Sequence, residues 1–182
     1  GAPLFVPPSL DWIPSIYAAF YALGQFVNGQ LGERLGARRM MTGALFIAAV
    51  TNLAMSSVSS FPAMLAIWAV NGYAQSAGWS LVIKTISEWT TSKRRGMVVG
   101  LISTCYQVGN VASWLLAGWL CSEWGWRTAF WVPGVVLLPI TAGFLLLARN
   151  RPADAGLAPV RDDVSAEPTS TDSHPAPGGK LG

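Results

Sequence analysis

The amino-acid sequence predicts an all-α membrane protein with five transmembrane helices. Hydrophobic residues make up 52% of the 182 residues and charged residues only 12%, about half the charge of a typical soluble domain. The charges are unevenly spread, and four long stretches carry none: residues 12–32, 40–83, 96–122 and 128–148. Each stretch is at least as long as the roughly 20 apolar residues that cross a bilayer. A soluble helical protein with these stretches would lack a polar surface, and continuous apolar runs do not suit the alternating strands of a β-barrel.

The longest charge-free stretch must contain more than one crossing. As one helix, residues 40–83 would extend about 66 Å, twice the thickness of the hydrocarbon layer. Serines and a proline within residues 56–62 interrupt this run, and they predict a turn. The five crossings are therefore expected, in chain order, at residues 12–29, 41–57, 62–88, 97–120 and 127–148.

Basic residues predict how these helices are oriented. They gather in alternate loops, so that the clusters fall on one side of the membrane: Arg34, Arg38, Arg39, Lys93, Arg94, Arg95, Arg149 and Arg151. Lysine and arginine are enriched in cytoplasmic loops, so loop 29–39 and the tail 149–182 are expected in the cytoplasm, in a protein of the plasma or inner membrane. The net charge of +3 follows from this topology and indicates no nucleic-acid partner.

The two ends of the chain differ in composition from the apolar part between them. Residues 1–10 contain three prolines and no methionine, and we expect them to be the end of a missing first helix with its outer loop. Residues 11–148 would form a partial amino-terminal transmembrane bundle. Residues 149–182 are rich in Pro, Ala, Asp, Ser and Gly and are expected to be a disordered cytoplasmic loop. The odd number of helices also predicts that the chain is part of a longer protein.

The sequence offers little catalytic or metal-binding chemistry. It shows no nucleophile–base pair, no cluster of metal ligands and no phosphate-binding loop, so we expect neither an enzyme nor a cofactor. The only histidine, His174, lies in the tail. Cys105 and Cys121 lie in one apolar stretch, and on one straight helix they would be roughly 24 Å apart. This distance is too long for a disulfide.

Polar residues inside the predicted crossings are the candidates for a functional site, because such residues are costly in a bilayer. Asn71, Gln75 and Gly78 share one face of the 62–88 helix, with Trp79 beside them. A second stripe on the next helix consists of Ser103, Tyr106, Gln107 and Asn110. These stripes either line a polar cavity or form hydrogen bonds between helices without any ligand.

Lys84 is the only cation in the interior of a predicted crossing, since Arg127 stands at the first position of the last one. Its long side chain could reach the cytoplasmic headgroups, or its ammonium could pair with Glu88 one turn later. The third alternative is contact with an anionic ligand.

Residues 29–39 read GQLGERLGARR and resemble the signature loop of the major facilitator superfamily, G-x-L-x-D-R-x-G-x-R-R, with Glu33 where aspartate is usual. Glycines permit close helix approach and a tight turn, and Glu33 can accept hydrogen bonds from an arginine or a helix N-terminus. The resemblance implies a gating loop that latches the outward-open state through Gly29, Glu33, Arg34, Gly36, Arg38 and Arg39. Alternatively, the arginines serve only to fix the topology.

A second segment is similar to the fourth helix of the organophosphate:phosphate antiporter family. It reads NGYAQSAGW at residues 71–79, and the basic residue Lys84 follows five positions later. YALGQF at 21–26 and RPADAGL at 151–157 are also similar to segments of this family. The resemblance covers about residues 10–158. It implies a twelve-helix fold in which the five crossings are helices 2–6, with the carboxy-terminal half missing from this chain.

This resemblance also implies a substrate path and a function. The residues that it places along the path are Gln25, Asn71, Gln75, Trp79, Lys84, Tyr106, Gln107 and Asn110. Bacterial members often have lysine at the position of Gln25 and histidine at that of Tyr106, and the family's phosphate-binding arginines lie on the first and seventh helices.

The implied activity is secondary active transport of a small anionic solute across a lipid bilayer. A phosphorylated sugar or glycerol phosphate would be exchanged for inorganic phosphate by alternating access. Two alternatives remain open: a transporter-like membrane sensor of sugar phosphate, and a carboxylate or sugar-acid transporter of the same superfamily.

Overall fold

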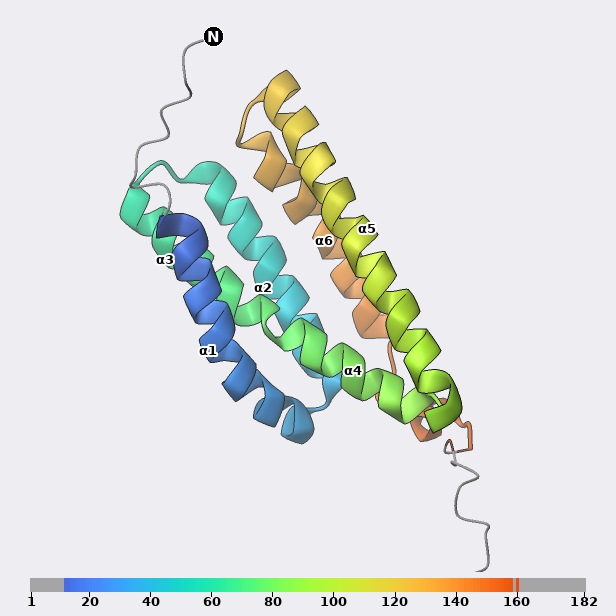
Figure 1. The fold of residues 1–182 in the computed structure, drawn as a ribbon. Coiled ribbons are helices and arrows are strands. Elements are labelled where there is room, and N and C mark those ends of the chain that lie inside the picture. The colour runs from blue at the N-terminus through green and yellow to red at the C-terminus, as the bar shows by residue number, and fades with distance from the viewer. Residues whose placement is uncertain (1–11, 159, 161–182) are drawn as a thin grey trace, which may run out of the picture.

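The computed structural model describes residues 12–158 and residue 160, and the regular structure in this part of the chain is helical throughout. The helices are, in order, α1 Trp12–Leu35, α2 Ala37–Ser57, α3 Phe61–Gln75, α4 Ala77–Trp89, α5 Ser92–Trp124, α6 Thr128–Leu147 and the short 3₁₀ helix η2 Pro152–Ala155. In Figure 1, α2 lies between α1 and α3 on one side and α6 on the other, and α5 runs along α6. The expected segment 1–10 and most of the tail 149–182 lie outside the described residues.

The described helices agree with the predicted all-α architecture. Four predicted crossings correspond to the continuous helices α1, α2, α5 and α6, and the predicted turn between the second and third crossings lies at residues 58–60. By length and hydropathy, α2 and α6 are the two described helices that are apolar enough to cross a membrane. Cys105 and Cys121 are both free thiols on α5, as expected.

The third predicted crossing, residues 62–88, differs from the prediction because it is interrupted at Ser76, between α3 and α4. The Asn28 side chain of α1 reaches this point. Its Nδ2 donates to the Tyr73 carbonyl oxygen at 2.9 Å and to Ser76 Oγ at 2.8 Å. Ser76 Oγ donates to the same carbonyl at 2.7 Å. Side chains that insert into the backbone ladder are a recognised cause of helix breaks, so the interruption follows from a polar contact between two helices.

The first connection is much shorter than the expected loop 29–39. Helix α1 continues to Leu35, and Gly36 alone separates it from α2. Gly36 has a φ of 82°, a conformation that only glycine adopts without strain. Residues 30–35 contain no proline, and the weak helix former Gly32 packs beside Leu81, so the helix continues and most of the signature motif is helical.

Helix α1 packs against α3 and α4 through small residues. Its buried positions are spaced by four: Gly24, Asn28 and Gly32. A Cβ on Gly24 would lie 2.9 Å from the Tyr73 carbonyl oxygen, and one on Gly32 would overlap Leu81. Facing α1, a Cβ on Gly72 would lie 2.5 Å from the Tyr17 carbonyl oxygen. Small residues let membrane helices approach closely, and here they bring the α1 backbone directly against the interrupted helix.

Candidate functional site

A cavity of about 620 Å³ opens between α1, α5 and the junction of α3 and α4, at the interruption of the third crossing. Its lining residues are Tyr17, Tyr21, Gln25, Gln75, Gly78, Trp79, Val82, Ile102, Ser103, Tyr106 and Gln107. Among these described residues there is no carboxylate, ammonium, guanidinium or imidazole group. The wall therefore presents amides, hydroxyls and aromatic faces, which suit neutral hydrogen bonds and stacking rather than ion pairing.

Helix periodicity places these side chains along the wall of the cavity. Tyr17, Tyr21 and Gln25 follow one another at intervals of four along α1, and the rings of the two tyrosines are stacked with centroids 5.9 Å apart. Across the cavity, the ring of Trp79 on α4 contacts that of Tyr106 on α5, with centroids 6.1 Å apart. This aromatic contact joins α4 to α5 in the cavity wall.

The structure brings together five of the eight residues expected along the substrate path: Gln25, Gln75, Trp79, Tyr106 and Gln107. Asn71 is fully buried and lies behind the wall, where its side chain bonds to Thr51 and Gln75. Asn110 is exposed on α5 outside the lining, with Nδ2 3.5 Å from Gln107 Oε1.

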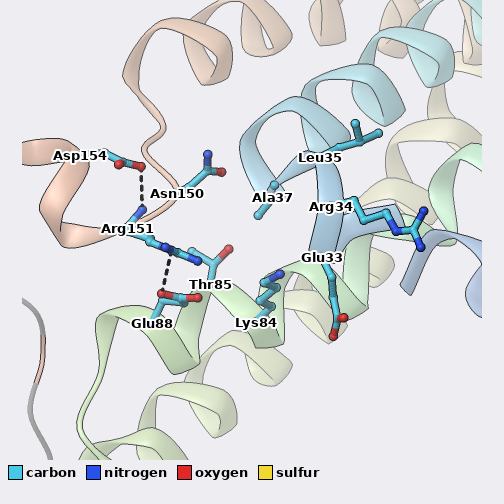
Figure 2. A pocket seen from close by; sticks show the side chains of 11 residues that line it. Glu33, Arg34, Leu35, Ala37, Lys84, Thr85, Glu88, Asn150, Arg151 and Asp154 are labelled. Carbon is cyan, nitrogen blue, oxygen red and sulfur yellow. Dashed lines mark hydrogen bonds and ion pairs between the residues drawn. The ribbon is translucent and has the colours of Figure 1, made fainter. Parts of the chain in front are cut away.

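Lys84 lies away from the cavity, in a second pocket of about 290 Å³ at the end of the bundle where α1 meets α2 (Figure 2). We call this end the basic end. The pocket is lined by Glu33, Arg34, Leu35, Gly36, Ala37, Lys84, Thr85, Glu88, Asn150, Arg151 and Asp154. Lys84 Nζ donates to the Gly32 carbonyl oxygen at 3.3 Å. Glu88 pairs with Arg151, Nε to Oε2 3.6 Å, rather than with Lys84.

The expected gating residues divide into different environments. The backbone N–H of Arg38 donates to Asn150 Oδ1 at 2.7 Å, and its guanidinium donates through Nε, at 2.9 Å, and through Nη2 to the Leu145 carbonyl oxygen. Arg38 thus joins the start of α2 to the end of α6, where carbonyl groups lack helical partners. Arg39 and Glu33 are exposed, and within the described chain the Glu33 carboxylate has no hydrogen-bonding partner.

The expectation that the first glycine of residues 29–39, Gly29, permits close helix approach is wrong for the described residues. No described atom of another helix lies within 4 Å of a Cβ built on Gly29, so this glycine permits no close helix approach within the described residues. Gly32 makes that approach instead, beside Leu81. The small-residue pair Gly96 and Gly100 on α5 is likewise open on all sides among the described residues.

Sequence reasoning missed several residues of the site. Tyr17 was not singled out, although its spacing with Tyr21 and Gln25 is the signal that would have identified this face of α1. Thr51 and Asn28 were missed because a single threonine or asparagine in an apolar helix gives no periodic pattern. Among the described residues, no group of three His, Cys, Asp or Glu side chains could hold a metal ion.

A helical bundle with an interrupted helix beside a polar cavity is the architecture of membrane transport proteins, in which discontinuous helices line the substrate site. The comparison with protein families agrees with this class. The family model of the Major Facilitator Superfamily matches residues 5–177, and the chain belongs to this family. This is a superfamily of membrane transporters rather than of enzymes, as the sequence predicts.

Individual relatives agree with the predicted branch of the superfamily. A "Probable hexose phosphate transport protein" of Chlamydia trachomatis is 28% identical over 173 residues, 94% of this chain and 37% of the relative. A protein of Arabidopsis thaliana provisionally named glycerol-3-phosphate transporter 2 is 36% identical over 123 residues, 64% of this chain and 24% of the relative. Glucose-6-phosphate exchanger SLC37A2 of Bos taurus is 28% identical over 159 residues, which are 82% of this chain and 31% of the relative. The chain thus spans between 24% and 37% of the length of these curated relatives.

Proposed function

We propose that this chain forms part of a secondary active transporter that exchanges a phosphorylated sugar or glycerol phosphate for inorganic phosphate by alternating access. One observation carries the proposal: five expected path residues from the four helices α1, α3, α4 and α5 gather around one cavity of about 620 Å³. The named activities of the relatives support the substrate class. Aromatic faces and amides are suited to the hydroxylated carbon skeleton of such a solute.

We assign the described helices to positions 2–6 of a twelve-helix fold, with α3 and α4 together as the fourth helix. In this assignment residues 11–148 are a partial amino-terminal bundle, 1–10 are the end of the first helix with its outer loop, and 149–182 belong to the central cytoplasmic loop. The basic end faces the cytoplasm of a plasma-membrane or inner-membrane protein, because its arginines and lysines satisfy the positive-inside rule. The phosphate group would be held by cations of the longer protein, since the described cavity wall has none.

The motif at the basic end acts in gating under this proposal. Arg38 already holds α2 to the segment after α6, whereas Glu33, exposed beside Arg34 and Lys84 (Figure 2), has a carboxylate available for a partner outside this chain. A carboxylate that engages a donor in only one state would bias the equilibrium between the states.

Exchange in proteoliposomes tests the substrate class. The complete gene product that contains this chain is reconstituted into vesicles loaded with inorganic phosphate, and uptake of labelled hexose 6-phosphate, glycerol 3-phosphate and a sugar acid is measured. We expect uptake of a phosphate ester that depends on internal phosphate. Uptake of the sugar acid alone would establish a carboxylate carrier, and binding of hexose phosphate without uptake would establish a sensor.

A matched pair of tryptophan variants links this activity to the cavity. Trp79→Leu removes a ring that lines the cavity, and we expect a loss of about tenfold in ester uptake, as for 1.4 kcal/mol of binding. Trp131→Leu makes the same change on α6, at an exposed residue outside the cavity lining, and uptake should stay within about twofold of the unmodified protein. Equal losses in both variants would remove the cavity from the proposal.

A further inference from the structure

A short chain of hydrogen bonds leads from helix α2 into the cavity. Asn71 Nδ2 donates to Thr51 Oγ1 at 2.6 Å, and Gln75 Nε2 donates to Asn71 Oδ1 at 2.6 Å. Thr51 is only 7% exposed and Asn71 is 0% exposed, whereas Gln75 is exposed and lines the cavity. Two buried side chains therefore hold one amide of the candidate site.

The donor-to-acceptor direction of these hydrogen bonds is fixed at the buried end, at Thr51. Thr51 has a single hydroxyl proton, which it donates to the Ile47 carbonyl oxygen at 2.7 Å. A backbone carbonyl can only accept, so Thr51 Oγ1 must act as the acceptor toward Asn71. Turning the Asn71 amide around would place its oxygen against that acceptor, and Thr51 would have to give up its bond to Ile47. The amide of Asn71 thus has one favoured orientation, with Nδ2 toward Thr51 and Oδ1 toward Gln75.

This orientation determines what Gln75 can offer to a ligand. One of the two N–H groups of its Nε2 is used by Asn71, which fixes the orientation of the amide, and within the described chain Gln75 Oε1 has no protein partner. We infer that Thr51 and Asn71 are positioning residues, which hold Gln75 with its carbonyl oxygen available to accept a hydrogen bond from a hydroxyl group on the carbon skeleton of the substrate. This inference rests on the proposed function and adds a basis for discrimination between the two exchanged solutes.

The discrimination follows from hydrogen-bonding chemistry. A hydroxyl on a sugar or glycerol skeleton can donate to a carbonyl oxygen, whereas the oxygens of phosphate are predominantly acceptors at neutral pH. An oriented Gln75 carbonyl therefore favours the phosphate ester, whose skeleton carries hydroxyl donors away from the phosphate group, over inorganic phosphate, whose oxygens are mostly acceptors. Loss of the Thr51 acceptor leaves the buried Asn71 amide unsatisfied, which frees Asn71 and Gln75 to take other orientations.

Three threonine variants of the complete gene product test the inference in proteoliposomes. Thr51→Val keeps the shape of the side chain and removes the acceptor, and Thr51→Ser keeps the hydroxyl. Thr42→Val is the control, since Thr42 is on the same helix and its hydroxyl makes the same kind of bond, to the Arg38 carbonyl oxygen at 2.8 Å. The KM and maximal rate are measured for hexose phosphate uptake and, separately, for exchange of phosphate against phosphate.

We expect Thr51→Val to raise the KM for hexose phosphate by about five- to tenfold, as for the loss of one hydrogen bond, while phosphate exchange changes by less than about twofold. Thr51→Ser and Thr42→Val should stay within about twofold for both solutes. Equal effects of Thr51→Val on the two solutes, or no difference between Thr51→Val and Thr51→Ser, would overturn the inference alone. An unmodified protein that exchanges neither solute would overturn the proposed function, and the inference with it.

Discussion

Helices α1 and α5 contribute side chains to the same cavity, but they are held in the bundle in different ways. Helix α1 lies against the interrupted third crossing, with Gly24, Asn28 and Gly32 buried in the contact. Helix α5 is longer, at 33 residues, yet Leu120 is its only buried residue among those described. Figure 1 shows α5 along the outside of the bundle, beside α6. One wall of the cavity is thus fixed firmly and the opposite wall is not.

The difference shows what fixes a helix in an apolar protein. Helix α5 is apolar over much of its exposed surface, and Trp114 for example is 80% exposed. Apolar area alone gives little attraction between helices in a bilayer, because lipid tails are equally apolar. Helix α1 is held instead by close backbone approach and by the Asn28 hydrogen bonds to Tyr73 and Ser76. Variants that remove these two features, with matched changes on α5, separate their contributions.

The largest effect is expected from a methyl group added at the close contact. Gly72→Ala would place a Cβ 2.5 Å from the Tyr17 carbonyl oxygen, and the backbones of α1 and α3 would have to separate. Overpacking of this kind costs about 2–3 kcal/mol. Gly100→Ala, on α5, meets no described atom within 4 Å and should raise stability by up to about 1 kcal/mol through helix propensity.

Thermal unfolding of both variants in detergent micelles checks this prediction. The apparent Tm of Gly72→Ala should fall and that of Gly100→Ala should rise or stay unchanged. If both variants lower the Tm equally, α5 is packed as tightly as α1 in the complete protein, and the comparison of the two walls does not hold.

A smaller effect is expected from removing the buried amide. Asn28→Ala loses two hydrogen bonds, to the Tyr73 carbonyl oxygen and to Ser76 Oγ, and should cost about 1–2 kcal/mol. Asn110→Ala makes the same substitution on α5, where the amide is exposed and has one long contact of 3.5 Å, and should cost less than about 0.5 kcal/mol. Unfolding in mixed micelles of increasing denaturing detergent measures both free energies, and a difference near zero would contradict the role given to Asn28.

The sequence predicted the fold well where the cause is local. The fifth crossing was expected at residues 127–148 and α6 spans Thr128–Leu147, because a charge-free run and its flanking charges lie in the same segment. The break at Ser76 could not be predicted in this way. Its cause is Asn28, 48 residues earlier in the chain, and no local pattern shows that an asparagine will reach a carbonyl on another helix.

The site was predicted only as far as helix periodicity allows. Periodicity placed Gln75 and Tyr106 on polar faces, and both line the cavity. It also placed Asn71 on the same face as Gln75, but α2 covers that position and Asn71 bonds to Thr51. Lys84 was assigned to the path because of the resemblance to the antiporter family, in which a basic residue follows the fourth-helix motif. Its position at the basic end depends on α1 continuing past residue 29 to bring the Gly32 carbonyl beside it.

The smallest expected effect concerns a third way of fixing helices, by an arginine at their ends. Arg38→Gln removes the guanidinium that donates to the Leu145 carbonyl oxygen, and this bond ties the start of α2 to the end of α6. Hydrogen bonds from charged groups stabilise more than neutral ones, but this one is exposed to solvent, so we expect a cost of about 1 kcal/mol. Arg39→Gln alters the neighbouring exposed residue and should cost less than about 0.5 kcal/mol.

This pair also separates the structural role of the motif from its topological one. Each variant loses one positive charge from the same end of the bundle, so any effect on membrane orientation should be nearly equal. The difference between their unfolding free energies therefore isolates the bond to Leu145. A lower free energy for Arg38→Gln with unchanged orientation, measured by cysteine labelling from each side of the membrane, would show that this arginine stabilises the bundle directly. Equal free energies would mean that the contact with α6 contributes no stability, and that the two arginines act only through their charge.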